Sequence, residues 1–217
     1  MKREAKRRFY VAVGLLAAFV LWTLAIRWVD VEEVGPMGSS VGFATVNQWF
    51  HRLTGVHMAL YTVTDWLSLI PLGIVFGFGC LGLYQWIARK SLFRVDRDIL
   101  ILGGFYVAVM GAYLLFEVVV LNFRPVLING ILEASYPSST TMLVLCVMLT
   151  AGMQLRTRIK GKKLRWGILA GIALFTAFMV VGRMLSGVHW LTDIIGGILL
   201  STALVTAYCG AVCLCRD

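Results

Sequence analysis

Long apolar runs dominate the hydrophobic pattern of this chain. Six of them approach the length of about 20 helical residues that is needed to cross the hydrocarbon core of a bilayer. Their approximate ranges are 8–28, 66–87, 99–121, 138–154, 166–185 and 190–212. Neither an internal repeat nor a low-complexity linker interrupts them. We therefore expect a single all-α domain over residues 1–217, built from six transmembrane helices.

A mixed polar and apolar segment separates the first two runs. It extends over residues 29–65 and is too long for a simple turn. Between residues 46 and 60, apolar positions are interspersed with polar and basic ones, which predicts an amphipathic stretch lying in the membrane interface. Such a stretch would either cover a site and guide a lipid into it, or serve only as a short packing helix.

The basic residues predict the orientation of the helices. Of the twenty Lys and Arg residues, five lie in the amino-terminal tail, four in loop 88–98, six in loop 156–165 and one at Arg216. An even number of spans brings these segments to one side, which the positive-inside rule assigns to the cytoplasm together with both termini. The predicted outer half keeps four basic residues, namely Arg27, Arg52, Arg124 and Arg183.

The composition supports a multi-pass protein of the cell membrane. Apolar residues make up 59% of the chain and charged residues 14%, with a mean hydropathy of +0.84. A soluble domain carries about 25% charged residues, so a soluble domain is excluded. The net charge of +9 flanks the spans, which favours lipid headgroups or a phosphate-bearing substrate as partners over nucleic acid. The five cysteines lie in spans or near the cytoplasmic end, so we expect no disulfide framework.

Candidate chemistry lies at the outer ends of the spans. His189 and Asp193 are four residues apart at the start of the last span, so on a helix they would share one face. A carboxylate in that position holds an imidazole in one tautomer and makes it a better nucleophile or base. The alternative is a purely structural interfacial pair.

A second cluster favours the catalytic interpretation. Arg124-Pro125 follows the third span, and residues 136–141, Tyr-Pro-Ser-Ser-Thr-Thr, open the fourth. A helix start with Ser and Thr caps is an anion site, although the same pattern also describes a well-capped helix beside an arginine. The predicted topology brings this cap, both arginines and the His-Asp pair to one leaflet. That combination suits a phosphoryl group that is bound, attacked and released.

These residues resemble the motifs of the type 2 phosphatidic acid phosphatases, membrane relatives of vanadium haloperoxidases. Three blocks describe that family: a lysine separated by six residues from Arg-Pro, then Pro-Ser-Gly-His, then Ser-Arg, five residues, His, three residues and Asp. The matching residues here are Arg124-Pro125, Pro137-Ser138, Arg183, His189 and Asp193. The motif resemblance covers residues 117–193, and the six-span layout is similar over the whole chain.

The resemblance implies a phosphohistidine mechanism that needs no metal and no other cofactor. His189 would attack phosphorus and Asp193 would orient the imidazole. The phosphate oxygens would be held by Arg124, Arg183, Ser138, Ser139 and Thr140, with Ser139 offering its backbone N–H.

Four positions depart from the family pattern. Gly182 stands in place of the serine, Ser139 in place of the glycine, Glu117 in place of the lysine and Thr140 in place of the histidine that protonates the leaving group. Threonine is no general acid near neutral pH, and losing such a group costs about 10²–10⁴ in rate. Because the phosphate group expelled from a diphosphate leaves more readily than an alkoxide, we expect a bias toward lipid diphosphates such as polyprenyl diphosphates. Glu117 would either pair with Arg124 or, with a raised pKa, replace the missing acid.

Three functional classes are consistent with these motifs. The leading one is a lipid phosphatase acting at the outer leaflet. The second is a lipid phosphotransferase with the same chemistry, in which His189 passes the phosphoryl group to an acceptor other than water. The third is a non-catalytic lipid-phosphate binder or transporter, which the altered second block favours.

Overall fold

Helices form most of the structure, which is a computed structural model that describes residues 2–215. The spanning helices are α1 (Lys2–Trp28), α3 with α4 (Met58–Leu67 and Leu69–Arg89), α5 (Arg97–Val118), α6 (Ser139–Arg158), α7 (Lys162–Leu185) and α8 (Leu191–Cys215). Within residues 2–215, β-structure is limited to isolated bridges. The predicted all-α architecture with six spans is confirmed.

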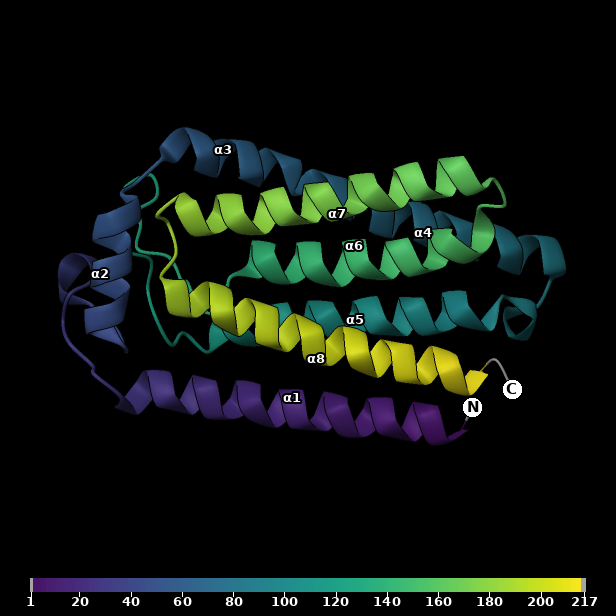
Figure 1. Ribbon diagram of the computed structural model, residues 1–217, viewed down its shortest axis with the longest axis horizontal. Helices are drawn as coiled ribbons and strands as arrows, with labels where there is room; N and C mark the ends of the chain where they lie inside the picture. The colour runs from purple at the N-terminus through teal and green to yellow at the C-terminus, as the bar shows by residue number, and fades with distance from the viewer. Residues whose placement is uncertain (1, 216–217) are drawn as a thin grey trace.

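The helices run side by side along the long axis of the molecule (Figure 1). The start of α1 and the end of α8 lie together at one end, which we call the terminal end. The opposite end carries α2 (Ala44–Thr54), which lies across the bundle, and the connections 119–138 and 186–190. We call it the loop end.

α6 lies at the centre of the bundle. Most of this helix is buried within the protein, whereas the other five spans turn most of their surface outward. A helix surrounded by protein can carry polar side chains that find partners inside, which explains why the fourth apolar run is the least hydrophobic. Thr150, for example, is fully buried and donates to the backbone oxygen of Cys146.

α1 packs along α8 and helps to hold the loop end in place. Trp22 Nε1 donates to the backbone oxygen of Thr192, and Thr23 Oγ1 lies 2.7 Å from the hydroxyl of Tyr136. The Tyr136 ring rests directly on α8, where a Cβ added at Gly196 would be 2.4 Å from a ring carbon. This glycine lets the connection before α6 approach the start of α8.

The boundaries around the second span differ from the prediction. The amphipathic helix α2 ends at Thr54, so residues 58–60 do not belong to it, and the second span begins at Met58 rather than at residue 66. The polar residues Thr62, Thr64 and Asp65 obscured this helical start in the hydropathy pattern. Their presence is explained by local partners, since Thr62 and Thr64 donate to backbone oxygens one turn earlier.

Other helix ends shift by a few residues. α1 begins at Lys2, so the basic tail belongs to the first helix, and α5 ends at Val118, three residues before the predicted limit. Arg124 therefore lies in the connection between α5 and α6 and not directly at a helix end.

Candidate active site

The connection between α7 and α8 is clamped by the segment between α2 and α3. His57 N donates to the backbone oxygen of Ser186, and His51 Nε2 lies 3.2 Å from the oxygen of Gly187. Gly187 has a φ of +69°, and a Cβ there would lie 2.1 Å from the oxygen of Gly55. Both the positive φ and the close approach require glycine, so the backbone that leads into His189 is firmly placed.

His189 and Asp193 lie close together, but the prediction that they share one face of a helix is wrong, because α8 begins at Leu191 and His189 lies in the connection before it. The two side chains are not in direct hydrogen-bond contact. His189 Nδ1 is 3.8 Å from Asp193 Oδ2, which is too long for a hydrogen bond. The hydroxyl of Ser135 lies between them, 3.0 Å from His189 Nδ1 and 2.5 Å from Asp193 Oδ2. Ser135 was missed in the sequence, where its position two residues before Pro137 is the one available signal.

The Asp193 carboxylate is held from several directions. The backbone N–H of Trp190 donates to Oδ2 at 2.9 Å, and Asn122 Nδ2 donates to Oδ1 at 3.4 Å. The backbone oxygen of Asp193 accepts from Ser138 N at 3.1 Å, which joins the start of α8 to the start of α6. Asp193 is fully buried and rigidly oriented.

His189 is buried, and its Nε2 has no hydrogen-bond partner among residues 2–215. Burial lowers the pKa of His189 to about 4; the Asp193 carboxylate opposes this shift, while the positive charges of Arg124 and Arg183 reinforce it. The imidazole is therefore neutral near pH 7. A neutral imidazole that bonds through Nδ1 presents the Nε2 lone pair, the form that a nucleophile requires.

Arg183 enters the site from the end of α7 and is held by α3. It is 1% exposed, and its Nη1 contacts Thr64 Oγ1 at 3.3 Å. Its Nη2 forms an ion pair with Asp65 Oδ1 at 3.4 Å, whereas its Nε has no partner among residues 2–215. The sequence did not indicate these α3 contacts.

Arg124 enters from the connection between α5 and α6. Its Nε lies 3.1 Å from Glu133 Oε2, and its Nη1 is buried without a partner among residues 2–215. The Tyr61 ring lies beneath both guanidinium groups, 4.7 Å from that of Arg183 and 5.8 Å from that of Arg124. Tyr61 thus ties the two arginines to one place through cation–π contacts, and it too was missed in the sequence.

Buried polar atoms without partners are rare in folded proteins. Here three of them, Arg124 Nη1, Arg183 Nε and His189 Nε2, belong to residues that the sequence assigned to one phosphate site. Both arginines lie near enough to His189 for their charges to lower its pKa, so two donors and a lone pair are available to a phosphoryl group, whose oxygens need donors and whose phosphorus accepts a nucleophile.

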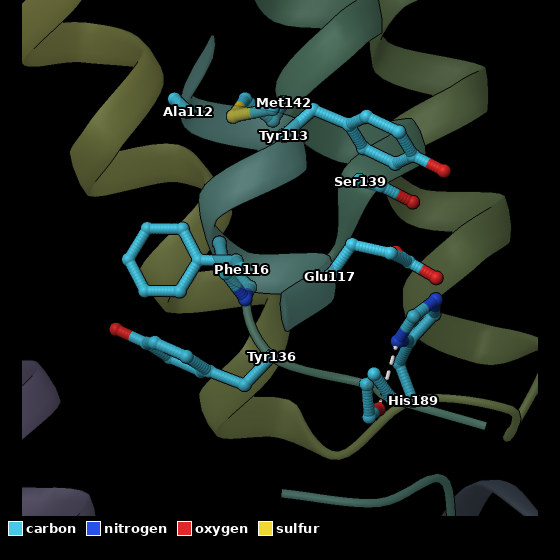
Figure 2. Close-up of a pocket in the computed structure, with 11 residues that line it drawn as sticks. Ala112, Tyr113, Phe116, Glu117, Tyr136, Ser139, Met142 and His189 are labelled. Carbon is cyan, nitrogen blue, oxygen red and sulfur yellow. Dashed lines mark hydrogen bonds between the residues drawn. The ribbon is translucent and has the colours of Figure 1, made fainter. Parts of the chain in front are cut away.

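The residues at the start of α6 that were predicted to bind phosphate differ in their positions. Ser138 is the N-cap, and its Oγ accepts from Thr141 N at 3.5 Å. Ser139 lines the same cavity as His189, together with Glu117 and Tyr113. Figure 2 shows the polar ends of Glu117, Ser139 and His189 directed toward this cavity from α5, α6 and the connection before α8. Thr140 does not line that cavity but faces an adjoining groove.

The adjoining groove is mostly apolar. It lies between α4, α5 and α6, has an empty volume of about 1020 Å³, and shares Tyr113, Ser139 and Met142 with the His189 cavity. Asp65 and Thr140 also border it. Of the acids at this end, Glu133 rather than Glu117 is the ion-pair partner of Arg124 within residues 2–215.

These features define a multi-pass helical membrane protein whose loop end joins an oriented neutral histidine to two buried arginines. A comparison with protein families matches residues 75–212 to the PAP2 superfamily. The match spans more than half of the chain, so the chain belongs to the PAP2 superfamily. The resemblance inferred from the three motifs is thereby confirmed.

Among solved structures, the chain is similar to the first transmembrane PAP2 type phosphatidylglycerolphosphate phosphatase from Bacillus subtilis. The two are 17% identical with a TM-score of 0.58, and the alignment covers 95% of this chain and 97% of that one. This similarity establishes a shared fold. No curated protein matches the sequence.

Proposed function

We propose that this protein is a lipid phosphatase that acts through a phosphohistidine on His189 and favours lipid diphosphates, such as polyprenyl diphosphates, over monoesters. The observation that carries the proposal is the buried, neutral His189. Its Nε2, like N–H groups of two buried arginines, has no hydrogen-bond partner within the described residues 2–215. Membership of a phosphatase family supports the reaction class.

The proposed reaction proceeds in two displacements. The Nε2 lone pair of His189 attacks phosphorus, the bond from phosphorus to the leaving oxygen breaks, and the developing charge is stabilised by Arg124 and Arg183. Water then attacks the phosphohistidine, the P–N bond breaks, and inorganic phosphate and neutral His189 are released. Throughout, the Nδ1 proton remains directed at the Ser135 hydroxyl, which in turn donates to Asp193.

The apolar groove beside Ser139 supports a lipid substrate. A phosphate held near His189 would place an attached chain beside this groove, which is open between membrane-spanning helices. The hydrophobic effect of burying that chain would supply binding energy away from the reacting phosphorus.

The preference for diphosphates rests on Thr140. A monoester releases an alkoxide that needs a proton in the transition state, whereas attack on the terminal phosphorus of a diphosphate releases a lipid monophosphate, which leaves without one. Glu117 lines the His189 cavity and is therefore our candidate for a residual proton donor to monoesters. Its alternative role, pairing with Arg124, is less well supported because Glu133 occupies that position.

We further propose that the loop end faces the outside of the cell and that both termini are cytoplasmic. The basic tail and the basic connections between α4 and α5 and between α6 and α7 belong to the terminal end, as the positive-inside rule requires of a cytoplasmic surface. The reaction would then occur at the outer leaflet.

A phosphate-release panel tests the function. The purified protein in detergent is given polyprenyl diphosphate, polyprenyl monophosphate and phosphatidic acid, and His189→Ala and His57→Ala are measured in parallel. We expect release by the wild type and by His57→Ala, which changes an exposed histidine at the same end, and none by His189→Ala. Activity in His189→Ala would refute the mechanism, and equal or better monoester turnover would refute the diphosphate bias.

A further inference from the structure

The strongest unexplained feature of the site is the hydroxyl of Ser135. We propose that Ser135 is a positioning residue that transmits the orienting effect of Asp193 to His189. The imidazole of the nucleophile is thereby oriented through a hydrogen-bonded chain of three residues. This inference rests on the proposed function, because it assigns a purpose to His189 Nε2 as the attacking atom.

The geometry leaves one consistent arrangement of protons. A hydroxyl has one proton to donate, and an ionised carboxylate only accepts, so the Ser135 proton goes to Asp193 Oδ2. The Ser135 oxygen must then accept from His189 Nδ1. This places the imidazole proton on Nδ1 and leaves the lone pair on Nε2, the atom for which the described part of the chain offers no hydrogen-bond partner.

The carboxylate of Asp193 does not fix the imidazole proton on Nδ1 by itself. The distance from His189 Nδ1 to Asp193 Oδ2 is 3.8 Å, and that oxygen already accepts from Trp190 N. Without the serine hydroxyl, Nδ1 would lose its acceptor, and the tautomer with the proton on Nε2 would become accessible.

Ser135 is placed by the same backbone pairing that places Arg124. Ser135 N donates to the oxygen of Asn122 at 2.9 Å, and Arg124 N donates to the oxygen of Glu133 at 3.0 Å. The serine is 2% exposed, so its side chain is confined by its surroundings. One short antiparallel pairing therefore positions both a phosphate-binding arginine and the residue that orients the nucleophile.

The test compares Ser135→Ala and Ser135→Thr with wild type, using Ser201→Ala as the control. Ser201 is a fully buried serine of α8 whose hydroxyl donates to the backbone oxygen of Gly197. With the lipid that the wild type hydrolyses, we expect Ser135→Ala to lower kcat by about 10- to 100-fold, the effect of losing a hydrogen bond in a charged network, with KM within about twofold. Ser135→Thr, which restores a hydroxyl, should recover much of kcat.

A second measurement needs no substrate. Diethyl pyrocarbonate modifies the neutral nitrogen of histidine, and mass spectrometry reports the rate at His189 and at the exposed His57 in the same molecule. We expect Ser135→Ala to slow modification at His189 and to leave His57 unchanged. If no lipid is turned over by the wild type, the proposed function fails, while this rate still tests the role of Ser135.

Two outcomes would overturn the inference. The first is a kcat in Ser135→Ala within twofold of wild type, or a loss that Ser201→Ala reproduces, which would reveal a general packing effect. The second is an unchanged modification rate at His189, which would show that Ser135 does not control the state of the imidazole. Thermal unfolding of each variant shows whether a loss of kcat is due to misfolding. If Ser135→Ala is misfolded, the rate of diethyl pyrocarbonate modification at His189 in Ser135→Thr decides instead.

Discussion

Glu117 provides a direct test of how the leaving group obtains its proton. Its carboxyl group extends from the last turn of α5 into the cavity that His189 faces. Glu117→Gln keeps the shape of the side chain but removes the proton that can be transferred. We expect this variant to lose turnover of a lipid monophosphate while largely keeping turnover of the corresponding diphosphate.

The expected magnitude follows from the position of the side chain. General acids contribute about 10²–10⁴ to a rate, and because Glu117 is exposed at the mouth of its cavity, water can replace part of its action. We therefore expect a loss in monoester kcat of about 10², at the lower end of that range, and less than about 10-fold for the diphosphate.

The assay measures initial rates of phosphate release from a polyprenyl monophosphate and the matching diphosphate in the same micelles. Glu133→Gln is the matched control, because Glu133 is the acid paired with Arg124 at 3.1 Å. The control should change KM without a substrate-selective loss of kcat. An unchanged monoester kcat in Glu117→Gln, or an equal loss with both substrates, would refute the acid role.

Three further outcomes are expected. Arg183→Lys should raise KM and lower kcat, so that kcat/KM falls at least about 10-fold, because one ammonium group cannot reach Thr64, Asp65 and a phosphate as the guanidinium fork does. Substrate titrations check this. Gly196→Ala should destabilise the fold by about 1–3 kcal/mol in thermal unfolding because its Cβ would overlap the Tyr136 ring, whereas Gly171→Ala, in open space, should not. Burial lowers the pKa of His189 to about 4, so kcat should show no loss attributable to this residue between pH 8 and pH 5 and should fall only as Nε2 is protonated at lower pH. A pH–rate profile checks this, and a loss of kcat centred near pH 6.5 that persists in His57→Ala would contradict it.

The spans could be predicted well because each has to satisfy the same local condition. A helix facing lipid must be apolar along its length, so hydropathy alone finds it. The prediction was wrong where protein rather than lipid surrounds the helix. Thr64 and Asp65 delayed the predicted start of the second span, yet both are accommodated by contacts with Arg183 from α7.

The motifs likewise located the main residues of the candidate site but not the residues that support them. His189 and Asp193 are close in sequence, and the Ser-Thr cap marks a helix start by local chemistry, so both could be read directly. Tyr61 and Asp65 lie outside the range matched to the PAP2 superfamily, and Ser135 lies 54 residues from the histidine that it contacts. No local pattern connects them to the site.

The sequence by itself therefore determined the membrane class, the number of spans, and the histidine, aspartate and arginines of the candidate site. The tertiary structure alone decided that Ser135 separates His189 from Asp193, that Tyr61 lies beneath both arginines, and that Glu133 rather than Glu117 pairs with Arg124. The physical reason is the range of the interactions. Hydropathy and helix capping act within one or two turns of chain, whereas these contacts arise only when α3, α7 and the connection before α6 pack against one another.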